Sequence, residues 1–88
     1  MKAIYKYLVP IKDVFTVDMP DGAAVLSVQV QFGEPKMWAL VDNSRPTTTR
    51  TFRVIGTGHL ISYSGPMKFI GTFQLHGGEL VFHLFEVL

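Results

Sequence analysis

Cysteine is absent from this chain of 88 residues, and its absence removes several kinds of chemistry. Disulfide bonds and thiolate metal sites are excluded. A chain without cysteine fits a reducing compartment, so we expect a cytoplasmic protein. Long apolar runs are missing as well, since nothing approaches the ~20 residues of a membrane-spanning helix. Lys6 and Lys12 interrupt the N-terminal stretch before a signal-peptide core can form. We therefore expect no association with a membrane.

An excess of charge of either sign is also missing. Eight Lys and Arg residues against seven Asp and Glu give a net charge of +1. A protein held on nucleic acid mainly through phosphate groups needs a basic stripe. No such stripe exists in this sequence, because its charged residues are scattered. We therefore do not expect the chain to bind a nucleic-acid polymer.

Residues for catalysis and metal binding are sparse. In a hairpin that turns at Gly77-Gly78, His76 lies at the tip and His83 further down, too far apart for one metal ion with ligand bonds of about 2 Å. The serines lie outside any G-x-S-x-G context, and no glycine motif ends in the GK[ST] of a phosphate loop. We expect a non-enzymatic protein with no catalytic residues, no metal and no cofactor.

The apolar fraction of the sequence is high for its length. At 88 residues the chain forms one domain, residues 1–88, of which 48% is hydrophobic. A domain of this size buries only about 60 to 65% of the surface of its unfolded chain. Apolar residues that the core cannot accommodate form surface patches, which mark contacts with partners. This surplus predicts a homo-oligomer.

Short runs of apolar and β-branched residues recur along the chain at roughly ten-residue spacing, with turn residues between them. Residues 24–32 alternate most clearly, with Leu26, Val28 and Val30 on one face and Ser27 and Gln29 on the other. Residues 37–42 lack alternation, so this strand is expected to be covered on both faces. The spacing predicts an all-β fold, an antiparallel sandwich or partly closed barrel of seven or eight short strands. The predicted strands are 3–9, 13–19, 24–32, 37–42, 50–57, 60–66 and the two arms of a hairpin from Met67.

The C-terminal hairpin is predicted to turn at Gly77-Gly78, because a two-residue turn needs positive φ at both positions. Counting outward from this turn places Phe73 opposite Phe82 and Thr72 opposite His83. The core face of the hairpin then carries Phe73, Leu75, Leu80, Phe82 and Leu84. We expect cross-strand pairs of His83 with Thr72 and of His76 with Glu79.

The arginines are clustered, unlike the lysines. Arg45, Arg50 and Arg53 fall within nine residues and lead into a Gly-Thr-Gly turn that could expose successive N–H groups to an anion. The planar guanidinium of arginine can donate two hydrogen bonds to one carboxylate or phosphate group. The side chain of Trp38 could stack on an aromatic ring of the ligand. The pattern predicts a site for an anionic, nucleotide-like ligand formed by Arg45, Arg50, Arg53, Gly56, Thr57, Gly58, His59 and Trp38. The alternative is solvated arginines, a bulge forced by the glycines and a core tryptophan. Asp42 is placed to pair with an arginine of a neighbouring strand.

The segments MWALVD (37–42), RTFRVIGTGH (50–59) and GTFQLHGGELVFHLFEV (71–87) resemble an uncharacterised family of short bacteriophage and prophage proteins. The segments IYKY (4–7) and VLSVQVQ (25–31) extend the resemblance nearly end to end. The family has no assigned catalytic residues to carry over. The resemblance implies a small accessory protein in the cytoplasm of a bacterial host, where such proteins often block host defence.

Two functions follow from these observations. In the first, the chain binds or sequesters a small anionic or nucleotide-like ligand at the Arg45–His59 region and so counters host defence. In the second, it is a protein-interaction module that inhibits a host protein without a small ligand. The arginine cluster favours the first, and the apolar surplus favours the second.

Overall fold

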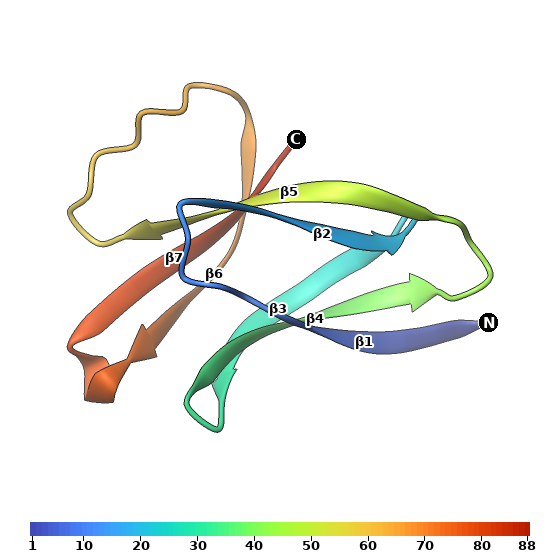
Figure 1. Ribbon diagram of the computed structural model, residues 1–88, viewed down its shortest axis with the longest axis horizontal. Coiled ribbons are helices and arrows are strands. Elements are labelled where there is room, and N and C mark those ends of the chain that lie inside the picture. Colours follow the sequence, from blue (N-terminus) through green and yellow to red (C-terminus); the bar gives the residue numbers. More distant parts are fainter.

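The computed structural model describes residues 1–88, and its regular structure is antiparallel β-strand except for one short 3₁₀ turn. Its strands form a three-stranded sheet in the order β1-β4-β3 and a four-stranded sheet in the order β2-β5-β7-β6 (Figure 1). The predicted all-β fold is confirmed as a sandwich-like arrangement of two sheets that do not close into a barrel. No helix is long and apolar enough to cross a membrane. The elements are β1 (Lys2–Leu8), β2 (Val14–Pro20), β3 (Ala24–Gln31), β4 (Glu34–Asp42), β5 (Thr47–Gly56), β6 (Met67–Leu75), the 3₁₀ turn η1 (His76–Gly78) and β7 (Leu80–Val87).

The core lies between the two sheets, where alternate residues of each strand meet. The ring of Phe15 on β2 stacks on that of Phe52 on β5, with centroids 5.4 Å apart. The core is small, since only 16 of the 88 residues are buried and the Cα atoms span just 15 Å in the thinnest direction. Both outer faces of the sandwich therefore have no further layer over them. The largest fully buried side chains are Phe52, Met19, Met37, Leu84, Val9 and Val41.

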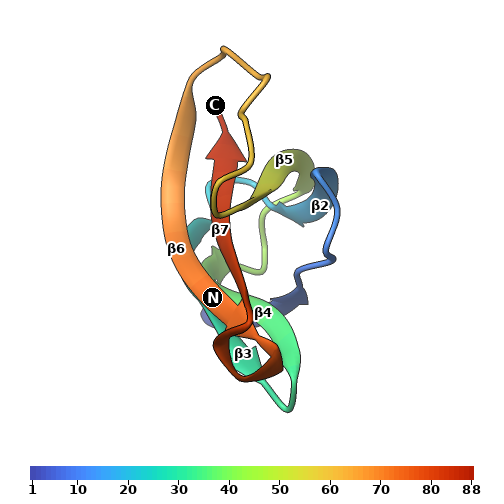
Figure 2. The same cartoon turned by 90° about the vertical axis from the view of Figure 1, so that its left-hand side faces the viewer.

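The two sheets approach each other most closely where β3 lies beside β6. A Cβ atom on Gly71 of β6 would lie 2.8 Å from Val28 Cγ1 on β3, closer than such atoms come in proteins. Glycine at this position lets the two strands approach. β6 and β7 lie side by side as a long hairpin, as Figure 2 shows.

The predicted C-terminal hairpin is confirmed in its turn and its register. Gly77 and Gly78 have φ angles of 66° and 96°, and the Glu79 N–H donates to the His76 carbonyl at 3.2 Å. The pairs from Leu75 with Leu80 to Gly71 with Leu84 are those obtained by counting from the turn. Phe73 and Leu84 are buried, as expected for the core face.

Three local predictions were wrong. A β-bulge between Val25 and Ser27 turns Leu26 out of the core, so that Val25 and Val28 both face the buried residues of β4. Residues 60–66 form no strand, because the chain leaves the sheet in a turn at Gly58 and then folds on itself. Residues 37–42 are not covered on both faces, because Leu40 lies on the side of the three-stranded sheet that has no layer over it.

Candidate ligand-binding site

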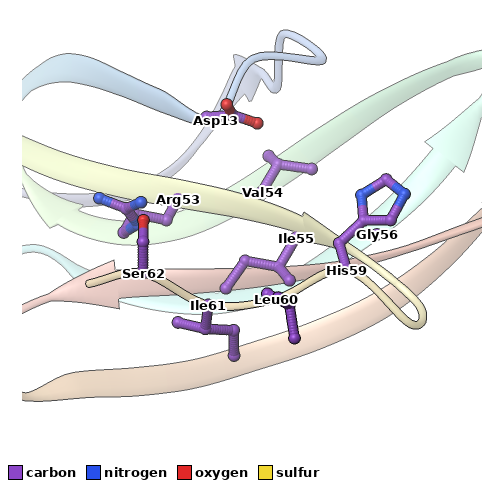
Figure 3. Close-up of a pocket in the computed structure, with 9 residues that line it drawn as sticks. All are labelled: Asp13, Arg53, Val54, Ile55, Gly56, His59, Leu60, Ile61 and Ser62. Carbon is purple, nitrogen blue, oxygen red and sulfur yellow. The ribbon is translucent and has the colours of Figure 1, made fainter. Parts of the chain in front are cut away.

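A cleft opens where β5 ends and the following loop folds back beside the four-stranded sheet (Figure 3). It has a volume of about 190 Å³. A second hollow of about 470 Å³ shares four of its lining residues and adds the apolar side chains of Ile11 and Phe82. The cleft therefore continues from a polar end into a more apolar one. Its lining residues are Asp13, Arg53, Val54, Ile55, Gly56, His59, Leu60, Ile61 and Ser62.

The turn after β5 fixes the histidine of the cleft. The His59 N–H donates to the Gly56 carbonyl at 3.1 Å, and Gly58 has a φ angle of 83°, which glycine adopts easily. The His59 ring lies against Gly56, where a Cβ atom would be 2.8 Å from Nδ1 of the ring. Glycine at position 56 therefore allows the imidazole to occupy the wall of the cleft.

The Gly-Thr-Gly turn does not present successive free N–H groups. The Thr57 N–H donates to the Val81 carbonyl at 3.1 Å, and the His59 N–H is used within the turn. The Gly58 amide has no backbone partner, but the amides on either side of it are bonded in this way. Because no run of free amides forms a nest here, anion binding at this site would depend mainly on side chains.

A histidine on β7 attaches this turn to the sheet. His83 Nε2 lies 2.7 Å from Thr57 Oγ1, and His83 Nδ1 lies 2.9 Å from Thr72 Oγ1. The predicted contact of His83 with Thr72 is confirmed, whereas His76 and Glu79 share only the backbone bond of the turn. The link from His83 to Thr57 was missed, because it joins residues that are 26 positions apart.

Arg53 is the cationic residue of the cleft. It projects from the outer face of β5, between Val14 on β2 and Phe85 on β7, so both cross-strand neighbours are apolar. Its Nε atom is buried without a hydrogen-bond partner, and it forms no ion pair. The guanidinium carbon lies 5.0 Å from the centroid of the Tyr63 ring, a cation–π contact. In Figure 3, Arg53 and Ser62 lie together at one end of the cleft and His59 lies at the other.

The other two arginines are neutralised. Arg50 faces the core, where its Nε and Nη2 donate to the two carboxylate oxygens of Glu86 at 2.6 and 2.8 Å, and its Nη1 donates to the Ala23 carbonyl. The hydrogen bonds to Glu86 raise the pKa of the Arg50 guanidinium above its ordinary value. Arg45, in the loop before β5, pairs with Asp21 at 3.0 Å on the surface.

Trp38 and Asp42 lie on β4 in the other sheet. Trp38 has Lys6 and Ser27 as its cross-strand neighbours and is remote from Arg53. Asp42 pairs with no arginine, and that prediction was wrong. Its Oδ1 accepts hydrogen bonds from Ser44 and from the Met1 amine. The Ser44 hydroxyl, with the Ser44 amide and the Met1 amine, holds the pKa of Asp42 well below its usual value.

Of the eight predicted site residues, the structure brings Arg53, Gly56 and His59 together in the cleft, with Thr57 and Gly58 in the adjoining turn. Arg45, Arg50 and Trp38 lie elsewhere. The prediction omitted Asp13, which the pairing of Val14 with Arg53 places beside the arginine. It also omitted Tyr63, whose ring folds back over Gly65 in the irregular loop. The position of Asp13 could have been predicted by pairing the strand 13–19 with the strand 50–57. Tyr63 lies in an irregular loop, where the sequence has no periodic pattern from which its position could be predicted.

A comparison with protein families gives one match, over the whole chain. Residues 1–88 match the family described as Domain of unknown function (DUF7352). The chain belongs to this family. No curated protein and no solved structure matches it.

Proposed function

We propose that the chain is a non-enzymatic protein that binds a small anionic, nucleotide-like ligand in the cleft at Arg53. The observation that carries this proposal is a difference among the three arginines. Arg45 and Arg50 each pair with a carboxylate, whereas Arg53 has none and keeps its Nε buried without a partner. Withdrawing a charged donor from water without compensation is costly. A bound carboxylate or phosphate would supply the missing acceptors.

The remaining walls of the cleft limit what else the ligand carries. The carboxylate of Asp13 disfavours a second anionic group beside it and can accept a hydrogen bond. Ile61 and, in the adjoining hollow, Ile11 and Phe82 offer apolar contact to a ring or chain. A ligand with an anionic head, a hydrogen-bond donor and a flat apolar body fits this combination. A nucleotide, with its phosphate and the amino group of its base, has all three.

The biological role that we propose is sequestration of such a ligand in the cytoplasm of a bacterial host, to counter host defence. Its support is the resemblance of the segments 37–42, 50–59 and 71–87 to phage and prophage proteins. A sequestering protein needs a binding site and no catalytic pair, and the sequence offers no such pair.

Thermal unfolding with a panel of nucleoside monophosphates, cyclic nucleotides, dinucleotides and inorganic phosphate tests the binding step. A ligand at 100 times its dissociation constant stabilises the folded state by about 2.7 kcal/mol. We expect this stabilisation in the wild type and in the matched control Arg45→Met, and its loss in Arg53→Met. Stabilisation by inorganic phosphate alone would show that the anionic head suffices. If no compound stabilises the wild type, or if Arg53→Met still responds, the proposal is wrong.

A second candidate function is a protein-interaction module that inhibits a host protein without a small ligand. One observation favours it: Phe32, at the tip of the β3–β4 hairpin, is 97% exposed and has a φ of 52°, a conformation unusual for a bulky residue. Exposed aromatic side chains are frequent anchors in interfaces. Capture of a defined host protein that is lost in Phe32→Ser but retained in Arg53→Met would favour this function over ligand binding.

A further inference from the structure

The outer face of the three-stranded sheet is apolar at its centre and has no layer over it. Strand alternation directs Ile4 of β1, Leu40 of β4 and Ala24 of β3 to this face, and the three residues lie side by side in the ladder. Ile4 is 60% exposed and Leu40 is 36% exposed. A contiguous apolar patch on a small domain marks a site of association.

Four of the five β4 residues on this face form a pattern that is complementary to itself. The face carries, in chain order, Glu34, Lys36, Trp38, Leu40 and Asp42. The last four, from Lys36 to Asp42, are a cation, two apolar residues and an anion. The pattern is centred on Ala39, and β4 is the middle strand of its sheet. If a second copy of β4 lies antiparallel over the first and centred on the same residue, position 36 faces 42 and position 38 faces 40. Each cation then meets an anion, and apolar side chains meet in the middle.

We propose that this face is a homodimer interface in which the β4 strands of two copies cross antiparallel about a two-fold axis at Ala39. Such an axis makes the contact isologous, so one surface serves both partners and the assembly closes as a dimer. Sheets packed face to face cross at about 30°. This rotation moves positions 38 and 40, next to the axis, by less than about 2 Å and positions 36 and 42, about 10 Å from the axis, by about 5 Å. The apolar residues therefore stay opposed, and the long side chain of Lys36 spans the offset to Asp42.

The charged residues at the two ends of this pattern, Lys36 and Asp42, can each form an ion pair with a second copy of the chain. The Asp42 bonds to Ser44 and to the Met1 amine all use Oδ1, which leaves Oδ2 without a partner in the chain. The only carboxylate near Lys36 is that of Glu34, at 3.4 Å. A dimer would add two Lys36–Asp42 pairs at its rim, which set the register and select the partner.

The size of the face predicts the strength of the dimer. Three strands about 4.8 Å apart and about seven residues long give a flat area on the order of 300 Å² per copy. With the relief of the side chains, two copies bury on the order of 1,000 Å², the lower limit for a specific interface. The dimer is therefore expected to be reversible in the micromolar range or weaker.

Sedimentation equilibrium of the full chain over a range of concentrations tests the proposal. The wild type is expected to dimerise, and each of Lys36→Asp and Asp42→Lys to weaken dimerisation at least tenfold, because each sets like charges against one another. Mixing these two variants is expected to restore association as a heterodimer, in which every facing pair again has opposite charges. Circular dichroism checks that each variant is folded. Leu40→Glu gives a further test at a partly exposed site, where folding does not depend on the side chain, and is expected to be monomeric.

The absence of cysteine allows an independent check of the geometry. A mixture of Trp38→Cys and Leu40→Cys chains is expected to form a disulfide-linked heterodimer under mild oxidation, more readily than either chain alone. A wild type that is monomeric at every concentration would overturn the proposal. So would a Leu40→Glu variant that dimerises like the wild type, or a mixture of Lys36→Asp and Asp42→Lys that associates no more strongly than either variant alone. The outcome is separate from that of ligand binding, because Arg53 lies in the other sheet and Arg53→Met is expected to dimerise as the wild type does.

Discussion

Arg50 and Arg53 lie three residues apart on the same strand and have opposite surroundings. Arg50 faces the core and donates to both carboxylate oxygens of Glu86 and to the Ala23 carbonyl. Arg53 faces outward between two apolar cross-strand neighbours and forms no ion pair with a carboxylate. Because β5 alternates, a spacing of three residues is enough to place one arginine in the core and the other at the cleft.

The difference separates a structural arginine from one that is available to a ligand. A half-buried guanidinium with an unpaired donor costs stability, and an apolar side chain of similar length would fit between Val14 and Phe85 without that cost. A residue that disfavours folding at its own position is a candidate for function, since binding sites commonly trade stability for activity. The comparison therefore makes opposite predictions for the same substitution at the two positions.

The largest effect is expected from Arg50→Met. The change leaves the carboxylate of Glu86, which is only 8% exposed, without its partner. Removing one member of a buried ion pair costs roughly 3 kcal/mol, so urea unfolding should show a loss of about that size. The double variant Arg50→Met/Glu86→Leu should recover most of it, because two apolar residues can replace a buried pair. A loss below about 0.5 kcal/mol in the single variant, a value typical of exposed pairs, would contradict this account.

Arg53→Met should have a smaller effect of the opposite sign. It removes a buried donor without a partner and keeps an unbranched side chain against the Tyr63 ring. We expect the free energy of unfolding to rise by up to about 1 kcal/mol, measured by urea unfolding beside Arg50→Met. A clear loss of stability would mean that Arg53 is structural and would remove the contrast on which the proposed binding site depends.

Much of the fold could be predicted from the sequence, because local signals agreed with the final structure. The glycine pair at 77–78 fixed the hairpin, and its register followed from counting. The bulge at Leu26 could not be found in this way, since the apolar alternation of residues 24–32 continues through it. The shift is visible only in the pairing with β4, where Val25 and Val28 lie opposite Ala39 and Met37 and Leu26 has no partner.

The candidate site could be predicted only where its residues are close in the chain. Arg53, Gly56 and His59 lie on one strand and its following turn, so their spacing in the sequence survives in space. The pairing of Arg50 with Glu86 joins positions 36 residues apart, and no pattern in the sequence distinguished Glu86 from the other scattered carboxylates. Of the three clustered arginines, one thus lines the cleft, and the other two pair with carboxylates elsewhere.

Arg45→Met tests whether an exposed ion pair contributes less to stability than the buried pair of Arg50. Arg45 also pairs with a carboxylate, that of Asp21, but both side chains are about half exposed. Exposed ion pairs contribute roughly 0 to 1 kcal/mol, so the free energy of unfolding should change far less than in Arg50→Met. Asp21→Asn, which removes the other member of the pair, should change the free energy of unfolding by a similarly small amount. Equal losses at Arg45 and Arg50 would show that burial does not distinguish the two pairs.

The smallest effect concerns Asp42, the carboxylate whose partners are uncharged Ser44 and the Met1 amine. Its pKa is lower in the folded chain than in the unfolded one, so the unfolded state takes up the proton first as the pH falls. The stabilisation that Asp42 contributes is therefore complete above about pH 4, the ordinary value for aspartate, and is lost progressively at lower pH.

Asp42→Asn should remove this part of the acid dependence. The free energy of unfolding should be measured for the wild type and the variant from neutral to acid pH. The two values should differ by a constant amount above about pH 4 and converge as the pH falls below it. Glu34→Gln is a suitable control, because Glu34 lies on the same strand and outer face and is expected to leave the difference unchanged. If the wild type and Asp42→Asn lose stability in parallel on acidification, the bonds of Asp42 to Ser44 and the amine contribute nothing to folding.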